Sequence, residues 1–123
     1  MTLAASGLLF QVRPDVLIPV VALRPTIATE ITRLLICNPT TSASSYSIYH
    51  RADGQESLNS LFVLYSEVSL SGGQTAVIEA LSENSGFGLR DGDVFGVQAS
   101  IANSLVFTGY GVTANLAQGN LPA

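Results

Sequence analysis

Residues 29–37 read Thr-Glu-Ile-Thr-Arg-Leu-Leu-Ile-Cys and lead directly into Asn38-Pro39. Successive side chains of a β-strand point to opposite faces of the sheet, so Ile31, Leu35 and Cys37 are expected to share one face. The other face also receives apolar residues, which suits a strand with at least one buried side. The proline ends the run, because the residue before a proline is forced away from the helical conformation. The stretch therefore predicts a strand that ends in a turn.

Similar strand signals extend from this stretch toward both ends of the chain. Upstream, residues 16–23 are rich in Val, Leu and Ile, although Pro19 removes a backbone donor and so favours an edge strand or a break. Downstream, Gly109 and Gly111 lie in the last apolar run and indicate a bulge or a close backbone approach. Turn motifs such as Asp53-Gly54 separate the runs. The expected strands are residues 16–23, 29–37, 45–51, 61–66, 75–81, 94–99 and 105–112, with residues 67–70 as a continuation or a short edge.

The spacing of these strands, with turn signals between them and no convincing amphipathic helix, predicts an all-β fold of about seven or eight strands. We expect an antiparallel β-sandwich of the jelly-roll or immunoglobulin-like type. Residues 15–112 would form this sandwich, between an N-terminal arm over residues 1–14 and a C-terminal tail over residues 113–123. The arm carries the apolar cluster Leu8-Leu9-Phe10, which favours docking on a partner because exposed apolar clusters mark contact sites.

Composition and charge exclude several functions. The chain of 123 residues is 47% hydrophobic and only 11% charged, whereas an average soluble domain is about a quarter charged. All five cations are scattered arginines, and the net charge is −4. Nucleic-acid binding needs clustered Lys or Arg that neutralise phosphates, so no nucleic-acid partner is expected. An anionic membrane surface is disfavoured for the same reason, and no apolar run is long enough to span a bilayer.

No combination of residues in the sequence indicates catalysis or metal binding. Cys37 and His50 are the only cysteine and the only histidine, so a zinc site lacks a paired ligand motif and both are expected to be structural. The triplet Asp91-Gly92-Asp93 leads at once into Val94-Phe95, which predicts a hairpin turn rather than a calcium loop. No serine lies in a Gly-x-Ser-x-Gly motif. We therefore expect a protein that is not an enzyme and has no cofactor or metal.

Several of these runs resemble one family. Residues 25–38, Pro-Thr-Ile-Ala-Thr-Glu-Ile-Thr-Arg-Leu-Leu-Ile-Cys-Asn, resemble a segment of small structural proteins of tailed bacteriophages, in which a proline-containing turn precedes a strand ending in Ile/Val-Cys-Asn. The resemblance continues through Leu64-Tyr65, the turn at residues 72–75 and the run at residues 89–100, and it covers residues 25–112. It implies a β-sandwich virion protein that acts by assembling, often as a trimer, on the capsid or in the tail.

The resemblance leads to one main hypothesis and two alternatives. The main hypothesis is a capsid decoration, or cement, protein: a homotrimer on the virion surface that binds the major capsid protein shell and stabilises contacts between capsomers. One alternative is a phage tail, neck or fibre component that contacts the host surface or a carbohydrate, and the other is a carbohydrate-binding module. The expected interface residues are Leu8, Leu9, Phe10 and Val12 as apolar anchors, and Arg13 and Arg24 as polar contacts.

Overall fold

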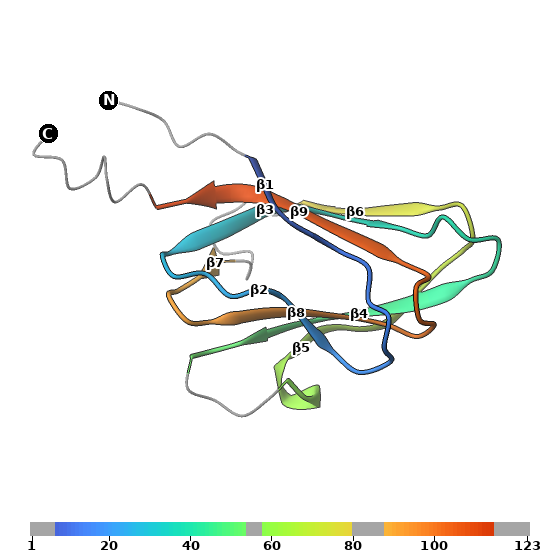
Figure 1. Cartoon of the computed structure of the whole chain (residues 1–123), viewed down its shortest axis with the longest axis horizontal. Helices are drawn as coiled ribbons and strands as arrows, with labels where there is room; N and C mark the ends of the chain where they lie inside the picture. Colours follow the sequence, from blue (N-terminus) through green and yellow to red (C-terminus); the bar gives the residue numbers. More distant parts are fainter. Residues whose placement is uncertain (1–6, 54–57, 80–87, 115–123) are drawn as a thin grey trace, which may run out of the picture.

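The chain folds into two β-sheets that pack face to face (Figure 1). The computed structural model describes residues 7–53, 58–79 and 88–114, which contain nine strands and one short 3₁₀ helix, η1 (Ser60–Phe62). Sheet A contains, in spatial order, β1 (Gly7–Val12), β9 (Val106–Thr113), β3 (Thr29–Cys37) and β6 (Thr75–Glu79), with β7 (Gly88–Leu89) also paired with β3. Sheet B contains β2 (Val20–Leu23), β8 (Val94–Ala99), β4 (Ser44–Arg51) and β5 (Val63–Leu70). The prediction of an all-β antiparallel sandwich is confirmed.

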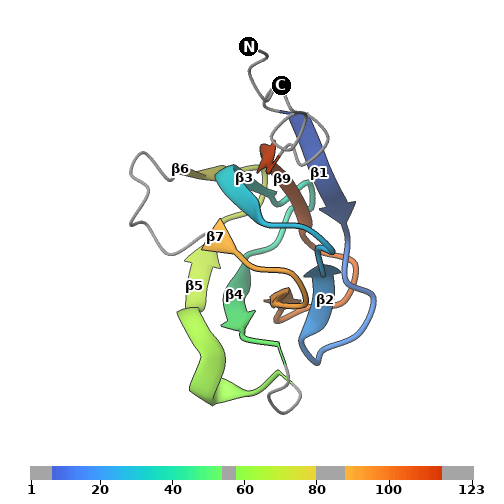
Figure 2. The same cartoon turned by 90° about the vertical axis from the view of Figure 1, so that its left-hand side faces the viewer.

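The strand order identifies the sandwich as a jelly roll, whose two layers are seen end-on in Figure 2. β1 pairs with β9, β2 with β8, β3 with β6 and β4 with β5, so the two halves of the chain pair as in one long hairpin. The long hairpin folds back on itself to form the two sheets, because β9 also pairs with β3 and β8 also pairs with β4. An immunoglobulin-like sandwich would divide its strands as ABED and CFG. Of the two expected types, the jelly roll is therefore the correct one.

The predicted N-terminal arm is wrong for the residues that the structure describes. Residues 7–12 form β1 and pair with β9 along sheet A. Phe10 is only 8% exposed, and its ring packs against Phe95 of sheet B with 5.8 Å between the ring centroids. Pro14 is also buried. The sandwich therefore begins inside the predicted arm, and residues 1–6 lie outside the described part of the chain.

The predicted C-terminal tail likewise begins later than expected. β9 continues to Thr113, and the N–H of Ala114 donates a hydrogen bond of 2.7 Å to the carbonyl of Ala28. The apolar run at residues 105–112 thus located the last strand but not its end. The rest of the predicted tail, residues 115–123, lies outside the described residues.

A bulge decides which residues of β3 enter the core. Ile31, Leu34 and Ile36 are all fully buried, although they do not share one parity. The register between β3 and β9 shifts between Ile31 and Arg33, so that one extra residue reverses the alternation of the side chains. The predicted common face of Ile31 and Leu35 is therefore wrong, because Leu35 lies opposite its buried neighbours.

Two glycines of β9 stand where no side chain fits. A Cβ on Gly109 would collide with the ring of Phe10, and a Cβ on Gly111 would collide with the carbonyl of Glu30. The pairing of β1 with β9 also shifts register in this region, between Leu8 and Phe10. The predicted close backbone approach is confirmed at Gly111, whereas the extra residues of the bulges lie opposite the glycines, in β1 and β3.

Candidate functional site

The outer face of sheet B, turned away from sheet A, carries a pocket of about 350 Å³. Its floor follows from the alternation of β4, in which Tyr46 and Ile48 are buried in the core. Their neighbours Ser45, Ser47 and Tyr49 therefore point outward and line the pocket. The other lining residues are Gln98 from β8, Ser100 directly after it, and Val63, Ser66 and Glu67 from β5. We call the site formed by these eight residues the polar pocket.

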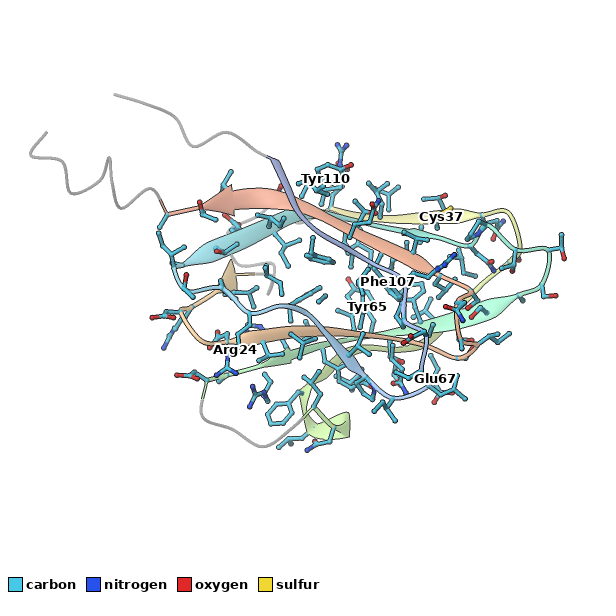
Figure 3. The ribbon with its side chains drawn as sticks, in the orientation of Figure 1. Arg24, Cys37, Tyr65, Glu67, Phe107 and Tyr110 are labelled. Carbon is cyan, nitrogen blue, oxygen red and sulfur yellow. The ribbon has the colours of Figure 1, made fainter. Side chains whose placement is uncertain are left out.

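Irregular pairing of β5 builds one wall of the polar pocket. Ser66 and Glu67 of β5 stand opposite the single residue Ser47 of β4, which is a bulge that bends the edge strand. Glu67 has a φ of 50°, in the left-handed region that a non-glycine residue rarely adopts. Its N–H donates a hydrogen bond of 2.9 Å to Ser47 Oγ, which holds the bulge in place. In Figure 3, Glu67 lies on the outer side of sheet B, whereas Tyr65 points between the two sheets.

Hydrogen bonds fix the floor of the polar pocket. The Tyr49 hydroxyl donates to Gln98 Oε1 over 2.5 Å. Gln98 Nε2 in turn donates to the carbonyl of Leu17, in the loop between β1 and β2, over 2.6 Å. On the same face, Ser100 Oγ accepts a hydrogen bond of 2.8 Å from the N–H of Ser45. These bonds hold the polar groups in place before any ligand arrives, which lowers the entropic cost of binding.

The polar pocket is uncharged apart from Glu67. Its described lining contains no lysine, arginine, histidine, cysteine or second carboxylate, so it holds no pair of nucleophile and base. Behind the floor, burial and the neighbouring Tyr65 raise the pKa of Tyr46, and this core hydroxyl stays neutral. The arrangement offers hydrogen-bond donors and acceptors to a ligand.

A second depression on sheet B is mainly apolar and has a volume of about 490 Å³. Ile18 is 66% exposed and Val21 is 55% exposed, although both are large hydrophobic residues. Leu58 lies over β8 where Gly96 leaves room for it, since a Cβ on Gly96 would collide with the leucine side chain. We call this site the apolar hollow, and its lining residues are Ile18, Pro19, Val21, Arg51, Leu58 and Val94.

The apolar residues predicted as arm anchors belong largely to the sandwich. Phe10 is part of the core, so its predicted role as an exposed anchor is wrong. Leu9 and Val12 are partly buried and pack against the same core. Leu8 differs from the other three because it is 60% exposed. Of the four, Leu8 alone keeps its predicted availability for a partner.

The two arginines predicted as polar contacts are both exposed. Arg13 follows the end of β1, and Arg24, labelled in Figure 3, follows the end of β2. The Arg24 guanidinium lies 3.5 Å from a carboxylate oxygen of Asp53, and both side chains are largely in solvent. A contact of either arginine with a partner stays a prediction.

The sequence places several polar residues of the pocket on the outward face of their strands, but this alternation alone does not predict a pocket. Ser45, Ser47 and Tyr49 share the outward parity of β4, and Gln98 has the outward parity of β8, which Ser100 follows two residues later. What brings the two sets together is the pairing of β4 with β8 and with the bulged β5. Strand pairing over such sequence distances is not encoded in local alternation, so the pocket could not be predicted.

His50 has a structural partner in Asp93, whose oxygen Oδ2 lies 3.1 Å from His50 Nε2. The buried Asp93 carboxylate also accepts hydrogen bonds from the N–H groups of Asp53 (3.0 Å) and Arg90 (3.1 Å). Burial raises the pKa of Asp93, but the hydrogen bonds from Arg90, His50 and Asp53 outweigh it and lower the pKa below its ordinary value. Gly92, with a φ of 86°, completes the predicted turn, which connects the two sheets rather than forming a hairpin.

The described part of the chain shows no metal centre, and the comparisons with known proteins give no family. Among residues 7–53, 58–79 and 88–114, no group of three or more His, Cys, Asp or Glu side chains is placed to hold a metal ion. No helix in this described part is long and apolar enough to cross a membrane. Comparison with known proteins found no matching family model, no matching curated protein and no matching solved structure.

Proposed function

We propose that this chain is a non-catalytic structural protein of a tailed-phage virion and acts as a capsid decoration protein. In this proposal, a homotrimer binds the outer surface of the major capsid protein shell and stabilises contacts between capsomers. The sequence resemblance over residues 25–112 supports the proposal, and so does the jelly-roll fold, which recurs in viral capsid domains. Each bound copy adds buried area across a capsomer seam, and the symmetry of the shell multiplies that area.

The apolar hollow is the observation that carries this proposal. Ile18 and Val21 stand out into solvent, and Val16 and Leu17 beside them are exposed as well. A cluster of exposed apolar side chains on a soluble domain marks a protein contact, because burying it in a complex releases it from water. Arg51 at the same site supplies the kind of polar contact that orients an apolar interface. The proposed docking surface is therefore the β2 side of sheet B and not an N-terminal arm.

The copy number in purified virions tests the proposed location. Quantitative mass spectrometry would compare the amount of this protein with that of the major capsid protein. A copy number similar to that of the major capsid protein is expected for a decoration protein. A few copies per particle would instead support a tail, neck or fibre component, and absence from the particles would overturn both.

A pair of valine variants tests the proposed docking surface. Val21→Glu places a charge in the apolar hollow, where docking would have to desolvate it, so we expect binding to shells that lack this protein to weaken by at least about tenfold. The matched control is Val77→Glu, because Val77 is 54% exposed on β6, an edge strand of the opposite sheet. Co-sedimentation with shells measures both. Equal binding of the two variants would show that docking uses another surface.

A further inference from the structure

The polar pocket has a chemistry that the docking proposal does not use. We infer that it binds a neutral saccharide, with one sugar residue of a glycan chain seated between β5 and β8. The pocket shares no lining residue with the apolar hollow, and the inference does not depend on a place in the virion. The two sites can therefore be tested separately.

The size of the polar pocket suits a small polar ligand. Its volume of about 350 Å³ is at the lower end of the range for small-molecule sites. This volume holds roughly a dozen water molecules, and a bound ligand would displace them. A ligand that replaces such waters must reproduce their hydrogen bonds, or else binding is lost.

The lining complements the hydroxyl groups of a sugar. The hydroxyls of Ser45 and Ser66 each offer a donor and acceptor sites, and the Gln98 amide has a second N–H besides the one bonded to Leu17. Val63 adds an apolar wall that a sugar can contact with its C–H groups. Donors, acceptors and a small apolar surface in one pocket match a ligand that carries all three at short spacing.

Other classes of ligand fit the polar pocket less well. An anion would meet no cation in the described lining and would be repelled by Glu67. A metal ion would find a single carboxylate. An extended peptide pairs along an open strand edge. β4 and β8 in the floor are paired on both sides, and the edge strand β5 in the wall is interrupted by its bulge at Ser66 and Glu67. A neutral saccharide requires none of these features.

Glu67 is the residue that sets the recognition. Its left-handed backbone costs free energy, and such strained residues persist where the surroundings fix them, commonly at binding sites. Here the hydrogen bond from its N–H to Ser47 Oγ fixes the residue in the pocket wall. The two carboxylate oxygens can accept hydrogen bonds from two adjacent hydroxyls of a sugar ring, and such charge-assisted bonds are stronger than neutral ones.

The test is a titration of the full chain with maltotetraose, cellotetraose and the tetramer of N-acetylglucosamine. Binding is measured from the changes in the protein's NMR chemical shifts. Ser66→Tyr fills the pocket, and its control is Ser69→Tyr, because Ser69 is exposed on the same strand outside the pocket. Glu67→Gln keeps the shape of the side chain and removes its charge. Its control is Glu79→Gln on sheet A, where the exposed pairing with Arg33 contributes little to stability.

We expect saturable binding of at least one of these tetrasaccharides, lost in Ser66→Tyr and weakened about tenfold in Glu67→Gln, with both controls binding like the parent protein. If Ser66→Tyr does not fold, the affinity of Glu67→Gln for the saccharides decides whether the pocket is the binding site. The inference is overturned if none of the three binds at millimolar concentration, or if binding survives in the pocket variants. Binding of inorganic phosphate or tetra-alanine at this pocket in place of the saccharides would overturn it as well.

Discussion

Asp93 connects backbone segments that are far apart in the sequence. Its carboxylate accepts hydrogen bonds from the N–H groups of Arg90 and Asp53, and it contacts the ring of His50 at the end of β4. The carboxylate is buried, so these donors have little access to water as an alternative partner. One side chain thus joins the β7–β8 turn to the end of the β4 strand.

Replacing Asp93 with asparagine is expected to lower the free energy of unfolding by about 1–3 kcal/mol at neutral pH. The amide keeps the size of the side chain, but it has one acceptor oxygen in place of two and turns an N–H₂ group toward the donors. Urea unfolding measures the effect. Asp91→Asn is the control, because Asp91 is exposed in the same turn and is expected to change stability little.

The stability difference between the parent protein and Asp93→Asn is also expected to depend on pH. The folded pKa of Asp93 is lowered, so the ionised carboxylate stabilises the fold above its unfolded pKa, and this contribution is lost as pH falls through the lower folded pKa. The difference between the parent protein and Asp93→Asn should therefore be largest above about pH 5 and shrink on acidification. A difference that grows toward low pH would contradict this account of the carboxylate.

Strand β1 is a short element on which much of the sandwich depends. It is an edge strand of sheet A, but its Phe10 ring reaches across to Phe95 of sheet B and covers the place where Gly109 lacks a side chain. The strand thereby closes one side of the core. Removing residues 1–14 would consequently unfold the sandwich rather than release a docking arm.

Two alanine variants on β1 measure this dependence. Phe10→Ala is expected to destabilise the protein by about 3–5 kcal/mol, because it leaves a cavity between the two sheets. Leu8→Ala lies on the same strand but in an exposed position, and its effect is expected to stay within about 0.5 kcal/mol. Urea unfolding of both proteins gives the comparison. A similar loss of unfolding free energy in the two variants would mean that Phe10 contributes no more to the core than an exposed residue of the same strand.

The two outer faces of the sandwich have different character. On sheet A, Arg33 and Glu79 form an exposed ion pair at 2.8 Å, and Gln11 bonds to Thr108. On sheet B lie both the polar pocket and the apolar hollow. With only 11% charged residues in the whole chain, the protein has few groups for long-range electrostatic attraction, so the proposed docking would depend on apolar contacts at the apolar hollow.

This asymmetry predicts that the proposed capsid binding depends weakly on salt. If docking buries the apolar hollow, a rise of about tenfold in ionic strength should change the affinity for capsid shells by less than about threefold, because salt screens charge pairs and not apolar contacts. Co-sedimentation at several salt concentrations measures this. A steep loss with salt would instead favour docking through charged residues such as Arg13 and Arg24.

The sequence patterns located the interior strands well and β1 poorly, for physical reasons. The runs around β3, β4 and β8 are long enough to show alternation or continuous burial between clear turns. β1 has six residues and a register shift after Leu8, so its alternation breaks before it can be recognised. A register shift also explains why the predicted face of Leu35 in β3 is wrong, since a bulge reverses the alternation of side chains on which that prediction depends.

The candidate site was harder to predict from the sequence than the fold. Ser47, Glu67 and Gln98 belong to three different strands, and none of them is unusual for an outward position in a sheet. Their proximity depends on the pairing of β4 with β5 and β8, and on the bulge that inserts Glu67. Such features arise when distant segments meet, so they follow from the three-dimensional fold and not from local composition.

The position of β9 between β1 and β3 also determines when the protein can complete its fold during synthesis. β1 leaves the ribosome first, yet the strand that it pairs with is the last of the nine to be made. Until then, sheet A lacks one of its interior strands, and the edge of β3 that pairs with β9 is open. Nascent chains with unpaired strand edges and uncovered apolar residues tend to associate with one another. Translation that stops before residue 106 therefore yields a chain prone to aggregation, and not a sandwich with one strand fewer.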